Sequence, residues 1–279
     1  MVDRKNASTA GKARGILKTP PAQGAFHHAR ILPSPELCPW IQHYWLVEWK
    51  LDASQQQTIE TLPHPNVHLV FSSEDGTALV HGVQTRKFQL LLKGHARVFG
   101  VKFQAGGFYA FLNAPVSSLR GKTIEATRVF GDAISSLQPV LSGDAAEASR
   151  IEEANRFFSH LIPDSDPDAL TASQIVESIL NNPQIRNVEA LSSNSGLSVR
   201  SLQRLFQRYV GVSPKWVISR YRMHELVELL NRGEEVDWAT RALEMGYFDQ
   251  SHLIRDFRRT TGWSPEKYRL RFFEQQARY

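Results

Sequence analysis

Arginine and glutamine side chains recur in two segments of the C-terminal third of the chain. Residues 198–214 have the sequence SVRSLQRLFQRYVGVSP, and residues 249–265 have the sequence DQSHLIRDFRRTTGWSP. An arginine can donate two hydrogen bonds to O6 and N7 of guanine, and a glutamine can pair with adenine. These residue types therefore suit the recognition of base edges, provided that a rigid element places them on one surface.

The two segments are copies of one structural unit, because a shift of 51 residues superimposes them without a gap. Ser198 and Asp249 are predicted helix N-caps, and Gly211 and Gly262 are predicted to end those helices in the left-handed conformation. A Ser-Pro pair then starts the next helix in each copy. The identical positions are Leu202, Arg204, Phe206, Arg208, Gly211, Ser213 and Pro214, which match Leu253, Arg255, Phe257, Arg259, Gly262, Ser264 and Pro265.

A second short helix is predicted before each copy, at residues 187–193 and 237–244, followed by a turn that contains Gly196 or Gly246. Two helices joined by a tight glycine-containing turn form a helix-turn-helix, so the chain is predicted to contain two. A linking helix is expected over residues 214–230. Its apolar stripe should pack against both units and consists of Met223, Leu226, Val227 and Leu230.

If Leu202 and Phe206 face inward, the opposite face of the first helix carries donors and acceptors without a carboxylate. We expect Arg200, Gln203 and Arg204 to contact bases, and in the second unit Ile254 to meet a thymine methyl and Arg255 to act as Arg204 does. The side chains expected at phosphates are Ser201, Gln207, Arg208, Arg258, Arg259 and Arg241. The alternative is a helical protein-interaction domain with solvated arginines, but the duplication favours DNA, because successive major-groove segments lie about 34 Å apart.

At these residues the chain resembles the AraC/XylS family of bacterial transcription regulators. The segments that carry the resemblance are GLSVRSLQRLFQRYVGVSP and RALEMGYFDQSHLIRDFRRTTGWSPEKYR. The resemblance implies a domain of about seven helices that binds promoter DNA, usually attached to an effector-binding or dimerisation domain. It places the base-contacting positions at Arg200, Gln203 and Arg204 in the first unit, and at Gln250, Ser251, Ile254 and Arg255 in the second.

Three positions depart from the pattern of this family. Arg241 and Asp256 stand where many members have an apolar or neutral residue, and Leu226 replaces a common small residue. A carboxylate at position 256 would repel phosphate unless it is paired with an arginine, so the second unit is expected to bind DNA more weakly.

The N-terminal part is predicted to be β-rich, because short runs of aromatic and β-branched residues alternate there with Gly, Pro, Asp and Asn. We therefore expect an α+β protein with a barrel-like N-terminal domain, flanking helices and an all-α C-terminal domain. The predicted divisions are a disordered tail at 1–22, the β-rich sensing or dimerisation domain at 23–162, a linker at 163–170 and the helical domain at 171–279. Residues from about Arg30 to Leu119, including LPHPNVHLVF and GVKFQAGGFYAFL, resemble an uncharacterised domain found ahead of the DNA-binding domain in some family members.

The bulk composition agrees with a polyanionic partner. The chain has 279 residues and a net charge of +5, and residues 170–279 carry 16 Lys and Arg against 12 Asp and Glu. No apolar run is long enough to cross a membrane, so a cytoplasmic protein without membrane contact is expected. The single cysteine, Cys38, is interpreted as a small buried apolar residue, with a catalytic nucleophile as the alternative.

Most of the histidines lie in the N-terminal part, which raises the alternative of a metal-dependent enzyme. His64 and His68, with Glu60 nearby, are the closest candidates, but their spacing matches no recognised metal motif. We therefore expect no enzymatic activity, no metal and no cofactor. Three hypotheses stay open: a regulator that responds to a small-molecule effector, a DNA-binding protein with a purely dimerising N-terminal domain, and a metal-dependent enzyme with a DNA-binding appendage. RNA polymerase is a further candidate partner, activation of transcription is the expected outcome, and the chain could be a monomer or a homodimer.

Overall fold

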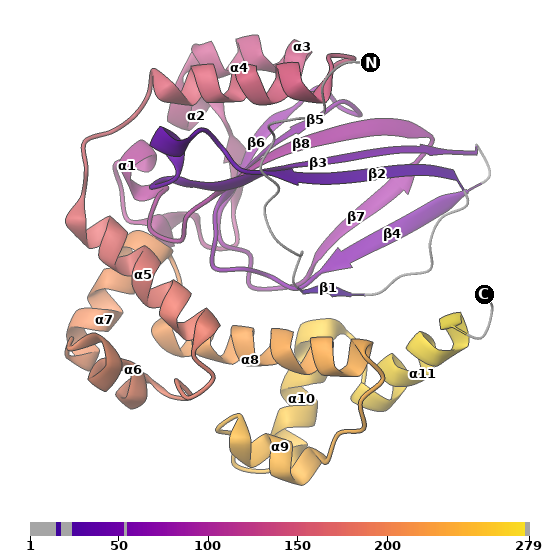
Figure 1. Cartoon of the computed structure of the whole chain (residues 1–279), viewed down its shortest axis with the longest axis vertical. Coiled ribbons are helices and arrows are strands. Elements are labelled where there is room, and N and C mark those ends of the chain that lie inside the picture. The colour runs from indigo at the N-terminus through magenta and orange to yellow at the C-terminus, as the bar shows by residue number, and fades with distance from the viewer. Residues whose placement is uncertain (1–14, 18–23, 53–54, 277–279) are drawn as a thin grey trace.

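The computed structural model describes residues 15–17, 24–52 and 55–276 of the chain. Figure 1 shows a β-rich N-terminal part and, beside it, a series of helices that continues to the C-terminus. The α+β class expected from the sequence is therefore confirmed.

The larger of two sheets has six strands in the order β2-β3-β8-β5-β6-β9, and every neighbouring pair is antiparallel. Side chains alternate between its faces, so β3 buries Tyr44 and Leu46 against the helices while Trp45 points to the opposite face. The strands are β2 (Gly24–Ile31), β3 (Ile41–Leu51), β5 (His68–Ser72), β6 (Ala78–His81), β8 (His95–Phe103) and β9 (Thr123–Glu125).

The smaller sheet has the order β1-β4-β7 and packs on the face to which Trp45 points. Its strands are β1 (Ile16–Leu17), β4 (Gln56–Thr61) and β7 (Phe88–Lys93). A closed barrel requires a hydrogen bond ladder between its first and last strands, whereas β2 and β9 each have one neighbour among the described strands. The N-terminal part therefore consists of two open sheets, and the barrel-like shape expected from the sequence is wrong.

Part of the expected N-terminal tail is ordered. Ile16 and Leu17 pair with Thr61 and Glu60 as strand β1, and the Leu17 side chain is buried. Residues 16–17 are thus a strand within the segment predicted as a tail, because they pair with β4, which the sequence of the tail cannot show. The rest of segment 1–22 lies outside the described residues.

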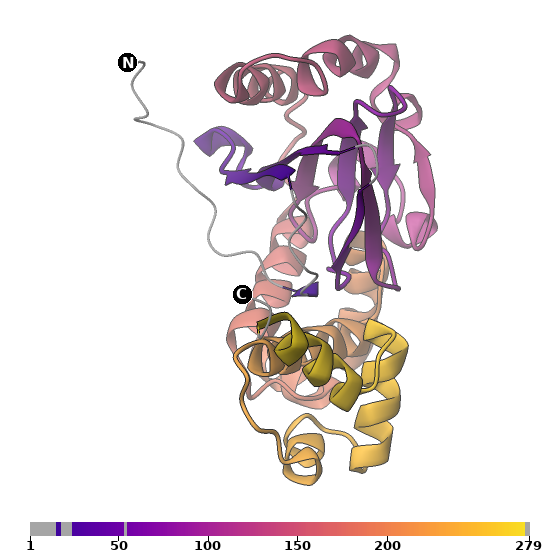
Figure 2. The same ribbon diagram turned by 90° about the vertical axis from the view of Figure 1, so that its right-hand side faces the viewer.

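Short helices cover the other face of the large sheet. The longest, α4, buries Ala154 and Phe158, and its Arg150 forms an ion pair of 2.5 Å with Glu48 of β3. Figure 2 shows α4 beside the sheet. These elements are η1 (Pro35–Leu37), α1 (Tyr109–Leu112), η2 (Val116–Leu119), α2 (Thr127–Phe130), η3 (Asp132–Leu137), α3 (Gln138–Leu141) and α4 (Glu147–Ser159).

The segment predicted as a linker over 163–170 is shorter in the structure. Asp166 accepts hydrogen bonds from the backbone N–H groups of Asp168 and Ala169, and Pro167 occupies the first turn of α5. Residues 167–170 are therefore helical, because an aspartate N-cap followed by proline starts a helix there.

From Pro167 onward the described chain contains seven α-helices, as the resemblance implied. They are α5 (Pro167–Asn181), α6 (Val188–Ser195), α7 (Val199–Leu205), α8 (Pro214–Asn231), α9 (Trp238–Glu244), α10 (Gln250–Thr261) and α11 (Pro265–Gln276). A π-helical turn, η4 (Phe206–Val210), continues α7.

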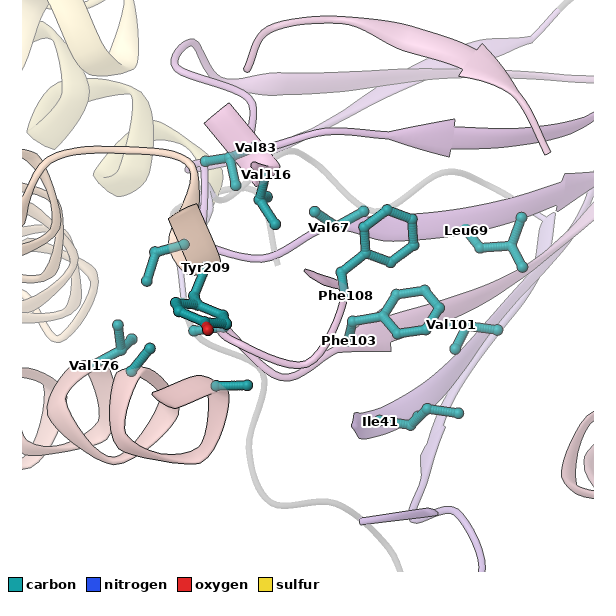
Figure 3. Close-up of a cluster of buried hydrophobic side chains, with 14 of the residues drawn as sticks. Ile41, Val67, Leu69, Val83, Val101, Phe103, Phe108, Val116, Val176 and Tyr209 are labelled. Atoms are coloured by element: carbon teal, nitrogen blue, oxygen red, sulfur yellow. The ribbon is translucent and has the colours of Figure 1, made fainter. Parts of the chain in front are cut away.

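One hydrophobic core extends across the two parts of the molecule. Phe103 and Phe108 belong to its β-rich side, and Val176 and Tyr209 belong to its helical side. Figure 3 shows Val116 and Val83 near Tyr209, on the side where the helices meet the β-rich part. The helices that carry the repeat are thus packed against the N-terminal part.

Cys38 is exposed, and the adjacent Leu37 is the buried residue. The expectation of a buried cysteine is wrong because η1 turns only one of the two side chains toward the core. Within the described helices, none combines the length and the apolar character that a membrane span needs.

Candidate nucleic-acid interface

The first helix-turn-helix consists of α6 and α7. The Asn187 side chain accepts a hydrogen bond from the N–H of Ala190 at 2.7 Å, and Gly196 ends α6 with a φ of 70°. Ser198 then accepts from the N–H of Ser201 at 3.1 Å and starts α7. The predicted caps on α7 are confirmed, and the two helices are joined by the three residues Gly196, Leu197 and Ser198.

The apolar stripe of the first unit fixes which face of α7 meets solvent. Leu202 and Phe206 are both completely buried. The face opposite this stripe is exposed at five of the six residues predicted to contact DNA on this helix, namely Arg200, Gln203, Arg204, Gln207 and Arg208. Ser201 is half-buried beside Ser198, and Arg208 is exposed but bound to the N-terminal part as described below.

The second unit, α9 and α10, repeats this arrangement. Asp249 accepts from the N–H of His252 at 2.7 Å, and Leu253 and Phe257 are completely buried. Ile254 is partly exposed. The other residues of this helix predicted to contact DNA are all exposed: Gln250, Ser251, Arg255, Arg258 and Arg259.

Helix α8 joins the two units, as Figure 1 shows. Its N-terminal half contributes Val217 and Ile218 to the core of the first unit, and its C-terminal half contributes Met223 and Leu226 to the core of the second. The apolar stripe Met223, Leu226, Val227 and Leu230 was predicted to pack against both units, but in the structure it packs in the core of the second unit. An 18-residue helix is about 27 Å long, so α8 sets a separation of that order between the units.

A buried arginine anchors α8 to α5. The Arg222 guanidinium donates to the carbonyl oxygens of Ile179 and Asn182, at 3.0 and 2.9 Å, and forms an ion pair with Glu225. These carbonyls lie at the C-terminal end of α5, where helix carbonyls lack partners and a cation is favoured. The sequence analysis missed this contact, because Arg222 lies among the charged residues of α8 with no local sign of burial.

Three of the four arginines predicted at phosphates have protein partners. Arg208 donates through Nε to the hydroxyl of Tyr109 at 2.9 Å, and its guanidinium carbon lies 4.8 Å from the centre of that ring. Arg259 pairs with Asp256, and Arg241 pairs with Glu244. Arg258 has no such partner among the described residues. Four residues of the predicted phosphate set are therefore exposed and Ser201 and Arg241 are partly exposed, but three of the arginines are already bound to other side chains.

Asp256 points into the protein. Its side chain is 7% exposed and accepts from the Tyr247 hydroxyl at 2.6 Å and from Arg259 at 2.5 Å. Burial raises the pKa of this carboxyl, but these hydrogen bonds outweigh burial and the net pKa is lowered. The sequence analysis expected an unpaired carboxylate to repel phosphate, but in the structure the Asp256 carboxylate is buried and paired with Arg259. The equivalent residue in the first unit, Leu205, is also buried.

The two copies differ where the first recognition helix ends. The N–H of Gly211 donates to the carbonyl of Phe206, five residues back, whereas the N–H of Gly262 donates to Arg258, four residues back. The wide turn in the first copy lies against η2, and a Cβ on Gly211 would be 3.0 Å from Cγ1 of Val116. The difference thus occurs where the N-terminal part packs on the first unit.

Two family models match this chain. Residues 191–271 match a family described as a helix-turn-helix domain, and residues 29–125 match a family described as a domain of unknown function, DUF6597.

Curated relatives match about a third of the chain or less. The HTH-type transcriptional activator RhaS of Escherichia fergusonii is 33% identical over 82 residues, which are 29% of this chain and 29% of that protein. An uncharacterized HTH-type transcriptional regulator of Haemophilus influenzae is 30% identical over 92 residues, 33% of this chain and 30% of that protein. The chain thus spans less than a third of the length of these relatives.

Solved structures of ToxT align with most of the chain at low similarity. ToxT from Vibrio cholerae O395 aligns over 78% of this chain and 97% of ToxT, with 11% identity and a TM-score of 0.38. Wild-type ToxT from strain SCE256, bound to an unsaturated fatty acid, aligns over 79% of this chain and 88% of ToxT, with 14% identity and a TM-score of 0.36.

The repeat, its caps and the matched family agree on the C-terminal part of the chain. Residues 191–271 form a double helix-turn-helix domain of the AraC type, and the β-rich part before it matches the family of unknown function DUF6597 over residues 29–125.

Proposed function

We propose that the protein is a sequence-specific DNA-binding regulator of transcription that acts on promoter DNA in the cytoplasm. One observation carries the proposal: two equivalent helices, α7 and α10, expose the same arginine-bearing face on units held together by α8. Rigid spacing of that kind suits two successive major-groove segments, which lie about 34 Å apart.

The free arginines support base contacts at matched positions. Arg200, Arg204 and Arg255 are exposed, and no ion pair or hydrogen bond holds their side chains among the described residues. Each guanidinium can therefore donate to guanine without first breaking a protein contact. Gln203 and Gln250 lie beside them and can pair with adenine. We propose that these residues, with Ser251 and Ile254, specify the sequence that the protein binds.

We further propose that the N-terminal part responds to a small molecule and changes DNA binding. It contacts both units: Tyr109 holds Arg208 of the first, and Leu17 and Leu62 pack in the core of the second. A ligand that favours one arrangement of these contacts would shift the equilibrium between states that bind DNA differently. This mechanism requires no enzymatic activity. It is also compatible with dimerisation through the N-terminal part.

Selection of bound sites from random double-stranded DNA tests the proposal. The full-length protein is expected to recover a motif with two half-elements about one helical turn apart. The Arg204→Ala and Arg255→Ala variants should each relax base preference in a different half-element. Arg156→Ala is the matched control, because Arg156 is an exposed arginine on α4. Recovery of no enriched motif, or equal effects of all three variants, would refute the proposal.

A further inference from the structure

A row of basic side chains crosses the large sheet on the face opposite the helices. His43 of β3 is in register with Lys102 of β8, Lys102 with His68 of β5, and His68 with His81 of β6. Residues in register on neighbouring strands point to the same face of a sheet. Arg30 of β2 extends the row, because its Nε lies 3.2 Å from Nε2 of His43.

Lys102 is the member of this basic row without a partner. Its side chain is 8% exposed, and no hydrogen bond or ion pair joins its ammonium to any described residue. Neighbouring imidazoles are already engaged, since His43 accepts from Arg30 and Nδ1 of His68 accepts from the Trp45 indole at 3.3 Å. A charge on a lysine that is buried to this extent and has no counter-ion is costly, so Lys102 is a candidate for a group that binds an anionic ligand.

Apolar side chains that solvent reaches lie next to the basic row. Trp45 and Val70 on the large sheet, and Ile59 and Leu90 on the small sheet, pack against one hydrophobic cluster but stay partly exposed. Figure 1 shows the small sheet set at an angle to the large one. The two sheets therefore place an accessible apolar surface beside an unpaired cation.

We propose that Lys102 binds the carboxylate of a small organic anion, whose apolar part lies against Trp45 and Val70. This inference rests on the proposed function, because it assigns the chemical class of the effector. A carboxylate would supply the counter-ion that the Lys102 ammonium lacks, and Arg30 would add to the attraction. Neutral analogues of the same shape would lack both contributions.

Binding should depend on pH, because Lys102 is held partly uncharged. Burial, and then the charge of Arg30, lower the pKa of Lys102 to about 7. A bound carboxylate favours the protonated amine, so above pH 7 each binding event must take up a proton and the affinity should fall about tenfold per pH unit.

The ionisable groups that face Lys102 are basic. They are His28 and Arg30 of β2, His43 of β3, His68 of β5 and His81 of β6. From the small sheet, Ile59, Leu90 and Leu92 pack toward this face, whereas Glu60 alternates with Ile59 on β4 and pairs with Lys87. The pKa values of His43 and His68 are lowered, first by burial and then by Lys102, so these imidazoles are uncharged across the range tested.

Titration calorimetry of the full-length protein with four probes tests the site. The probes are benzoate and hexanoate, each paired with its amide, at pH 6.5 and 8.5. We expect a carboxylate to bind more tightly than its amide and more tightly at pH 6.5. Lys102→Met should weaken carboxylate binding about tenfold to a hundredfold, and the exposed Lys50→Met of β3 should not.

Thermal unfolding of each variant verifies that it is folded, and Lys102→Gln provides a second neutral substitution. The proposal is wrong if neither carboxylate binds, if the amides bind equally well, or if both Lys102 variants bind like the wild type. A gel-shift assay on selected DNA, with and without carboxylate, separates the two proposals. DNA binding together with no carboxylate effect would overturn the effector site alone, whereas carboxylate binding without any DNA binding would overturn the proposed function.

Discussion

Replacement of Lys102 by methionine should stabilise the protein, and the size of this effect should depend on pH. In the folded protein, burial holds the pKa of Lys102 at about 7, against an ordinary value of 10.5. The unfolded chain therefore binds one more proton than the folded chain between these two pH values. Protonation of Lys102 favours the unfolded state, so this lysine destabilises the folded protein at every pH at which it is charged in the unfolded chain.

The magnitude follows from the shift in pKa. One pKa unit corresponds to 1.36 kcal/mol, so a charged Lys102 costs about 4 kcal/mol near neutral pH. The wild-type free energy of unfolding should rise by about 1.4 kcal/mol per pH unit between pH 7 and pH 10 on account of this residue. The free energy of unfolding of Lys102→Met lacks this pH dependence. The variant should therefore exceed the wild type in stability by the full amount below pH 7 and by nothing above pH 10.5.

Urea unfolding followed by circular dichroism at pH 6.5, 8.0 and 9.5 measures this difference. The comparison of variant and wild type at each pH cancels the titration of all other groups. Lys50→Met is the matched control on the same sheet, and because Lys50 is exposed its effect should stay within about 0.5 kcal/mol. The reasoning about Lys102 would be refuted if Lys102→Met were no more stable than the wild type at pH 6.5. It would also be refuted if the difference in stability between them did not decrease toward pH 9.5.

The helical domain yields further expectations. Arg204→Ala and Arg255→Ala should each weaken specific DNA binding by about 1 to 3 kcal/mol, measured by fluorescence anisotropy on selected DNA; an unchanged base preference would contradict base contact. Phe206→Ala and Phe257→Ala remove completely buried rings and should each lower the free energy of urea unfolding by about 3 to 5 kcal/mol. Either variant unfolding at the wild-type midpoint would contradict the packing. Asp256→Ala should cost about 1 to 3 kcal/mol by the same measurement, because it leaves the hydroxyl of Tyr247 without its buried acceptor; a neutral effect would show that this hydrogen bond contributes nothing.

Local signals in the sequence were enough to predict the helical repeat. Ser198, Asp249 and Ser213 each accept a hydrogen bond from the N–H group three positions ahead, and Gly211 and Gly262 end their helices with positive φ. Each of these interactions joins residues close in the chain, so residue type and spacing decide it. For the same reason the inward orientation of Leu202 and Phe206, and the outward orientation of Arg204, followed from a period of 3.6 residues.

Strand content was also predictable, but strand pairing was not. The aromatic and β-branched run IQHYWLVEWKL forms β3, whereas the sequence of β4, QQTIET, contains few apolar residues that would indicate a strand. Ile16 and Leu17 form a strand only because β4 is present to pair with them. Closure into a barrel likewise depends on which strands become neighbours, and composition does not record that.

The sequence by itself determined the two helix-turn-helix units, their caps and the residues on their exposed faces. Tertiary structure alone decided the contact of Arg208 with Tyr109, the inward turn of Asp256 and the row that unites His43, Lys102 and His68. The physical reason is range. Helix caps and helix faces depend on neighbours within one or two turns, whereas a register across a sheet and a contact between domains depend on the burial of surfaces contributed by distant segments.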